Sequence, residues 1–120
     1  MRGEALYLQD IVDAANEVFE FVAGLDYDAF VADKAIRKAV LCDLVIAGEA
    51  ANHISDAVQA RYPGINWSGV ISFRHYAVQH YFGIRWRDVW ESASQELPAL
   101  AQQIEHILKE EFPEPEDQDL

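Results

Sequence analysis

The side chains best suited to chemistry gather in one stretch, residues 67–82, which is predicted to be a helix. This stretch holds no acid, but it carries one arginine, two histidines and two tyrosines: Arg74, His75, Tyr76, His80 and Tyr81. An arginine stabilises the extra negative charge on a pentacoordinate phosphorus. An imidazole that titrates near neutrality moves the protons of a 2′-hydroxyl and of a leaving group. These residue types suit metal-free cleavage of RNA, although a histidine on a helix is more often packed or solvent-facing than catalytic.

The spacing of these groups on a continuous helix limits which of them can act together. Arg74 and Tyr81 are seven residues apart, so the guanidinium and the phenol are expected on one face. His75 and His80 then point roughly 100° and 120° away, on opposite sides of the helix. A single copy does not bring Arg74 and His80 together easily, whereas two copies related by a two-fold axis could. We therefore expect a homodimer with a composite site.

The distribution of charge restricts the class of partner. The chain of 120 residues has a net charge of −12, which argues against a protein that coats duplex DNA. Residues 57–87 nevertheless hold no acid and four arginines: Arg61, Arg74, Arg85 and Arg87. This stretch is either reserved for an anion or paired with acids elsewhere in the fold, and charge alone leaves both interpretations open.

Apolar residues spaced three and four apart predict helices throughout one globular domain, residues 1–112. The first helix covers Leu8 to Val22, with Gly24 as its stop signal and Asp26 or Asp28 as the N-cap of the next helix. A second, unusually long helix runs from Phe30 to Val58, and Gly48 within it is expected to allow close helix packing.

The second half of the chain is predicted to hold two more helices. A Pro-Gly turn leads to Asn66, a candidate N-cap for a third helix over 67–82 that ends at Gly83. A fourth covers 85–112 and is kinked or restarted at Pro98. Residues 113–120 are predicted to be an acidic disordered tail. The expected fold is all-α, a mostly antiparallel bundle of four to five helices.

Other features exclude several functions. The N-terminus lacks the apolar region of a secretory signal, and no apolar run is long enough to span a membrane. Cys42 is the single cysteine, so neither an intrachain disulfide nor a cysteine-based zinc site is expected, and its apolar neighbours predict a buried, inert thiol. We therefore expect a cytoplasmic protein without a metal or cofactor. We assign His53 and His106 structural roles, and the three tryptophans are expected to anchor the core.

The order and spacing of several short motifs resemble the HepT-like branch of the HEPN superfamily, over roughly residues 6–110. The landmarks are Ile46-Ala-Gly-Glu-Ala50, Pro63-Gly-Ile-Asn-Trp67, Phe73-Arg74, Tyr81-Phe-Gly-Ile84, Val89-Trp90 and Leu97-Pro98. Each motif alone is weak, and the combination is specific. The resemblance implies a dimeric, HEPN-like helical bundle and the toxin half of a toxin–antitoxin pair.

The resemblance also implies roles for individual residues. An Arg-x4-His-x-Tyr motif at the dimer cleft cuts RNA without metal, and its arginine and tyrosine match Arg74 and Tyr81. The implied partner is an MntA-like minimal nucleotidyltransferase antitoxin that adds AMP to the motif tyrosine, which makes Tyr81 the AMP acceptor. The glutamate of the Gly-Glu landmark is Glu49, to which the sequence assigns no role.

One departure from the family pattern affects catalysis. Gln79 stands where the family has its histidine, His80 follows one place later, and His75 occupies a position that is usually asparagine. Glutamine hydrogen-bonds a phosphate but does not exchange a proton at neutral pH. We expect Arg74 and His80 to be catalytic, with His75 and Gln79 as alternative contributors. The alternative is a catalytically impaired dimer that serves a nucleotidyltransferase as partner or substrate-binding subunit.

Overall fold

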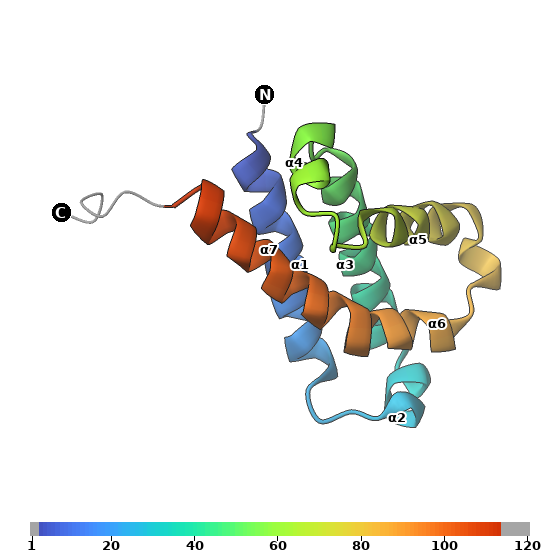
Figure 1. The fold of residues 1–120 in the computed structure, drawn as a ribbon. Coiled ribbons are helices and arrows are strands. Elements are labelled where there is room, and N and C mark those ends of the chain that lie inside the picture. Colours follow the sequence, from blue (N-terminus) through green and yellow to red (C-terminus); the bar gives the residue numbers. More distant parts are fainter. Residues whose placement is uncertain (1–2, 114–120) are drawn as a thin grey trace.

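The computed structural model describes residues 3–113, so the predicted tail lies almost entirely outside the described residues. Every regular element in this part of the chain is helical, and the all-α prediction is confirmed (Figure 1). In chain order the elements are α1 Glu4–Val22, α2 Tyr27–Ala32, α3 Lys34–Asn52, α4 Asp56–Arg61, α5 Trp67–Gln79, a 3₁₀ turn Tyr81–Gly83, α6 Trp86–Glu91, a π-helical turn Ser92–Glu96 and α7 Leu97–Glu111. None of these helices is both long and apolar enough to cross a membrane.

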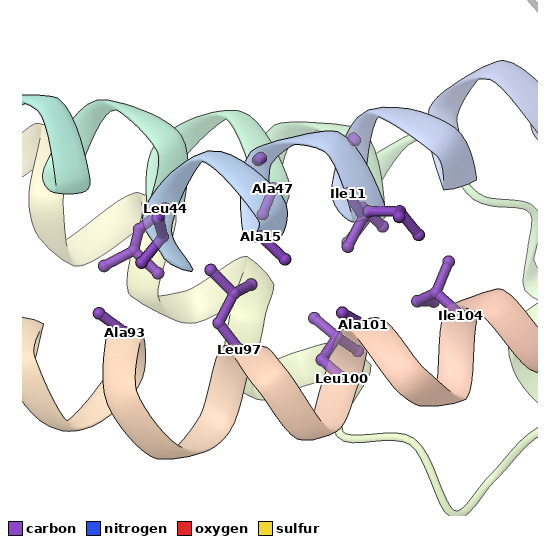
Figure 2. Close-up of a cluster of buried hydrophobic side chains, with 14 of the residues drawn as sticks. Ile11, Ala15, Leu44, Ala47, Ala93, Leu97, Leu100, Ala101 and Ile104 are labelled. Atoms are coloured by element: carbon purple, nitrogen blue, oxygen red, sulfur yellow. The ribbon is translucent and has the colours of Figure 1, made fainter. Parts of the chain in front are cut away.

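The core forms where α1 packs against both α3 and α7, and α5 packs on α3 (Figure 1). Figure 2 shows aliphatic side chains of these helices converging on one another: Ile11 and Ala15 from α1, Leu44 and Ala47 from α3, and Leu97, Leu100, Ala101 and Ile104 from α7. Removing this apolar surface from water is the main stabilising contribution to the fold. The four longer helices thus form a bundle, and the short helices connect them.

The predicted first helix is confirmed, together with the signals that end it. Its buried stripe includes Leu8, Ile11 and Val18. Gly24 adopts a φ of +77°, the left-handed conformation that favours glycine. The Asp26 carboxylate then accepts a hydrogen bond from the Ala29 N–H at 2.9 Å, which caps α2.

The prediction of one long second helix is wrong, because two N-caps divide it. The Asp33 carboxylate accepts the Ile36 N–H at 3.0 Å and begins α3 after a break from α2. The Ser55 hydroxyl accepts the Val58 N–H at 3.2 Å and begins α4. Each cap satisfies an otherwise unpaired backbone donor, so the chain reorients while the apolar stripe continues across the breaks.

The third predicted helix ends early, whereas the fourth is helical over almost its whole predicted length. Asn66 caps α5 as expected, accepting the Gly69 N–H at 3.0 Å, but α5 ends at Gln79 instead of Phe82. The predicted helix over 85–112 is helical without a gap from Trp86 to Glu111, as α6, the π-helical turn and α7 in succession, with Pro98 in the first turn of α7. Proline has no N–H to donate to the preceding turn, which accounts for the local change from α-helical to π-helical hydrogen bonding.

The prediction of a buried thiol at Cys42 is wrong. The buried stripe of α3 passes through Val40, Leu41 and Leu44, and Cys42 falls on the other side of the helix, where it is exposed.

The three tryptophans pack against the core, as the sequence predicted. Trp67 is 6% exposed, and the other two tryptophans pack partly buried against the core.

Candidate functional site

The candidate site begins where α5 crosses α3 at Gly48. A Cβ atom at this position would lie 2.5 Å from the Arg74 Cβ and 2.7 Å from the Val70 carbonyl oxygen. Only glycine permits so close an approach of the two backbones, so the prediction of close packing at Gly48 is confirmed. The consequence is that Arg74 lies directly against α3.

Arg74 forms an ion pair with an acid of the neighbouring helix. Its Nε lies 3.1 Å from Glu49 Oε1, and its side chain is 30% exposed. Nε is itself buried and makes no hydrogen bond among the described residues. The Arg74–Glu49 contact is therefore close enough for an ion pair, but its geometry is not that of a hydrogen bond. The Arg74 side chain is therefore only partly covered by its contact with α3.

The other arginines of the acid-free stretch, residues 57–87, also have partners within the fold. Their contacts bear on whether this stretch is reserved for an anion or paired with acids. Arg61 pairs with Glu111, and Arg85 lies 3.7 Å from Asp88. The guanidinium of Arg87 lies over the Tyr27 ring, 3.7 Å from its centroid. Three of the four arginines therefore pair with acids, as the plainer interpretation predicts, and Arg87 contacts an aromatic ring instead.

Glu49 also binds a histidine that was predicted to be merely structural. His53 Nε2 lies 3.2 Å from Glu49 Oε2, one helical turn further along α3. The His53 ring stacks on Tyr7 with a centroid distance of 4.7 Å and an interplanar angle of 8°. The His53 side chain is 47% exposed. A single carboxylate thus connects Arg74 with an imidazole.

The three residues predicted to move protons or replace the family histidine lie at different places on α5. The Arg74 Nη1 donates to His75 Nδ1 at 3.5 Å, so this exposed ring is closer to the guanidinium than a separation of 100° suggests. Gln79 is the last residue of α5 and is exposed. His80 is the C-cap, and its ring lies 5.6 Å from that of Tyr76.

The sequence predicted that Tyr81 and Arg74 share one face of a continuous helix. The structure differs, because α5 ends two residues before Tyr81. Tyr81 instead begins the 3₁₀ turn, where it is 42% exposed and meets the edge of Phe82. Phe82 is 99% exposed, which the sequence did not predict. Tyr81 and Val78 line a shallow apolar groove against the outer face of α3.

Two carboxyl groups outside this cluster have strongly shifted pKa values. Burial of Asp43, followed by the neighbouring carboxyl of Glu17, raises the pKa of Asp43 to about 7. Hydrogen bonds from Arg61 and Tyr62 lower the pKa of Glu111 to about 2. Within residues 3–113, no group of three or more histidine, cysteine or acidic side chains is arranged to hold a metal ion.

Comparison with known proteins identifies the class. Residues 11–107 match the family described as Ribonuclease HepT-like, and the chain belongs to this family. A protein of Methanocaldococcus jannaschii named "Putative RNase MJ1380" is 32% identical over 106 residues, which cover 88% of this chain and 97% of that protein. The "Probable ribonuclease HepT" of Thermococcus cleftensis is 30% identical over 108 residues, covering 90% and 98%. No solved structure gives a significant match.

Proposed function

We propose that this protein is the toxin of a toxin–antitoxin pair and acts as a metal-independent RNA endonuclease. The observation that carries the proposal is the position of Arg74, which is held against α3 but 30% exposed, with an imidazole 3.5 Å from its guanidinium. Membership of the HepT-like ribonuclease family supports the same conclusion. Arginine and histidine together can bind a phosphodiester and move protons at it without a metal ion.

The proposed reaction is a transesterification in which the RNA supplies its own nucleophile. Arg74 binds the scissile phosphate and stabilises the charge that develops on it. The 2′-oxygen forms a bond to phosphorus while the bond to the 5′-oxygen breaks, giving a 2′,3′-cyclic phosphate and a 5′-hydroxyl. The proton leaves the 2′-hydroxyl and one is returned to the 5′-oxygen, so no water is consumed. We assign these transfers to His80, with His75 as the alternative because it lies beside Arg74.

We further propose that the site is shared between two protomers. His80, six residues after Arg74, caps the end of α5 and packs on Tyr76. A second copy related by a two-fold axis would supply its own His80 to the first copy's Arg74. The exposed apolar side chains at this end of α5, Val78 and Phe82, favour such a contact because they leave apolar surface in water.

The proposed regulation is addition of AMP to Tyr81 by a minimal nucleotidyltransferase antitoxin of the MntA type. The support is that Tyr81 is 42% exposed and lies in a short turn after α5. Its oxygen would attack the α-phosphate of ATP and release pyrophosphate. The product carries a new negative charge and a bulky nucleotide close to the cleft, which would repel RNA.

The test is RNA cleavage by the purified full-length protein in EDTA. Arg74→Ala is expected to lower the cleavage rate by about 100-fold or more, because it removes the phosphate ligand. Arg85→Ala is the matched control, since Arg85 is 77% exposed and pairs only loosely with Asp88. Equal RNA integrity with wild type and Arg74→Ala would refute the proposal.

A second candidate function is a non-catalytic partner subunit for the nucleotidyltransferase, and Gln79 is the feature that favours it. Gln79 is exposed at the end of α5, so Gln79→His can be made without disturbing the core. Cleavage that appears only in Gln79→His would identify the natural protein as the inactive form. Cleavage by the unaltered protein would exclude this alternative.

A further inference from the structure

One carboxylate on α3 joins the proposed phosphate ligand to a histidine outside the Arg-x4-His-x-Tyr motif. Glu49 Oε1 lies 3.1 Å from Arg74 Nε, and Glu49 Oε2 lies 3.2 Å from His53 Nε2. The guanidinium and the imidazole therefore each contact one oxygen of the same carboxylate. This arrangement does not depend on a second protomer.

The contact with Glu49 fixes which nitrogen of His53 can exchange a proton. An ionised carboxylate only accepts hydrogen bonds, so Nε2 must carry the hydrogen. In the neutral ring Nδ1 then holds a lone pair and is the basic nitrogen. The stack on Tyr7 holds the plane of the ring, and the His53 side chain is 47% exposed. A carboxylate that orients an imidazole in this way is a recurring element of general-base sites.

We propose that His53 is a proton-transfer residue of the ribonuclease site and that Glu49 is its positioning residue. This inference rests on the proposed function but gives the two proton transfers to His53 in place of His80, and it supplies an imidazole that position 79 lacks. His53 Nδ1 takes the proton of the 2′-hydroxyl as the 2′-oxygen bonds to phosphorus. The bond from phosphorus to the 5′-oxygen breaks, and the ring returns the proton to that oxygen. The step needs no water, metal or redox partner.

The chain contains a matched pair that separates this role from a merely structural one. His106 Nε2 lies 3.1 Å from Glu110 Oε1 on α7, with the same four-residue spacing as Glu49 and His53. The His106 side chain is 63% exposed, and no arginine shares its carboxylate among the described ion pairs. His106→Gln therefore removes an equivalent histidine–carboxylate contact away from Arg74.

The experiment measures single-turnover cleavage of an RNA oligonucleotide by the full-length protein, together with binding of its 2′-O-methyl form by fluorescence anisotropy. His53→Gln is expected to lower the cleavage rate by about 100-fold or more while leaving the Kd within about twofold. His106→Gln is expected to change neither quantity by more than about twofold. Glu49→Gln should lower the cleavage rate by roughly 10-fold or more, because the ring loses its fixed orientation.

Chemical rescue provides a readout that a structural role would not move. His53→Ala removes the ring but keeps the helix, and added imidazole should restore at least part of its cleavage rate. Imidazole should not rescue Arg74→Ala, which lacks the phosphate ligand. Thermal unfolding of each variant checks that it is folded at the assay temperature.

The outcomes separate the inference from the function on which it rests. Wild-type cleavage by His53→Gln, with Arg74→Ala inactive, would overturn the inference and leave the proposed function intact. Loss of cleavage without rescue by imidazole, or an equal loss of binding, would assign His53 a structural role and overturn it as well. Equal cleavage by wild type and Arg74→Ala would remove the proposed function, and this inference with it.

Discussion

Gly48 sets the distance between α3 and α5, and Gly48→Ala tests that contact directly. The added Cβ would lie 2.5 Å from the Arg74 Cβ and 2.7 Å from the Val70 carbonyl oxygen. Comfortable contact between such atoms requires about 3.5–4.0 Å. Neither obstacle can rotate away, because one is a backbone atom and the other is bonded to the backbone. The two helices must therefore separate by about 1 Å where they cross.

Two opposing effects determine the size of the change in stability. Alanine stabilises the interior of a helix by about 1 kcal/mol relative to glycine. Overpacking a close contact typically costs about 1–3 kcal/mol, and contacts that cannot relax lie at the upper end of this range. We expect Gly48→Ala to lower the free energy of unfolding by about 1–2 kcal/mol in total. For a domain of this size, that lowers the Tm by roughly 4–8 °C.

The assay is thermal unfolding followed by circular dichroism at neutral pH. Gly64→Ala is the control, because a Cβ there would meet nothing within 4 Å and the backbone is not left-handed. Its Tm is expected to stay within roughly 2 °C of wild type. A Gly48→Ala protein as stable as wild type, or more stable, would show that α3 and α5 do not cross as closely as the Gly48 geometry requires.

Two further predictions concern pH. The folded state raises the pKa of Asp43 from 3.8 to about 7, so between these pH values the folded chain binds more protons at Asp43 than the unfolded chain does. The free energy of unfolding should therefore fall as pH rises from about 4 to about 7, by up to about 1.4 kcal/mol per pH unit. Asp43→Asn should flatten this part of a plot of Tm against pH, and an unchanged slope would contradict the assignment. Because the folded state lowers the pKa of Glu111 from 4.5 to about 2, its stabilisation is present above pH 4.5 and is lost as pH falls toward 2. Glu111→Gln should remove that acid-dependent decrease in Tm, and a decrease of the same size in the variant would refute the role of its contacts with Arg61 and Tyr62.

Periodicity predicted which residues form the core better than it predicted where helices begin. The stripe of α1 was visible in the sequence because its apolar residues recur every three or four positions up to Gly24. The breaks at Asp33 and Ser55 were missed because apolar spacing continues across both caps. Asp and Ser are good N-caps, but they are also common within helices, so the choice between the two depends on tertiary packing.

The candidate site was only partly predictable. Arg74 was identified by its residue type and by the motifs around it, but its partner Glu49 lies 25 positions earlier in the chain. That contact depends on how two helices cross, which periodicity does not specify. Two signals pointed toward it: Gly48 marked the close approach, and Glu49 and His53 have the four-residue spacing of a helical pair. Taken together, these signals indicated a close helix contact beside Glu49 and a contact between Glu49 and His53, but not which helix packs there.

The central claim is that Arg74 supports attack by a 2′-hydroxyl without a metal ion. The most direct measurement incubates the purified protein in EDTA with an RNA oligonucleotide and with a copy that is 2′-deoxy at the cleaved position. The account predicts 2′,3′-cyclic phosphate ends from the RNA with wild type, no cleavage of the deoxy copy, and no cleavage of either by Arg74→Ala. Cleavage of the deoxy copy, or equal cleavage of the RNA by Arg74→Ala, would contradict it.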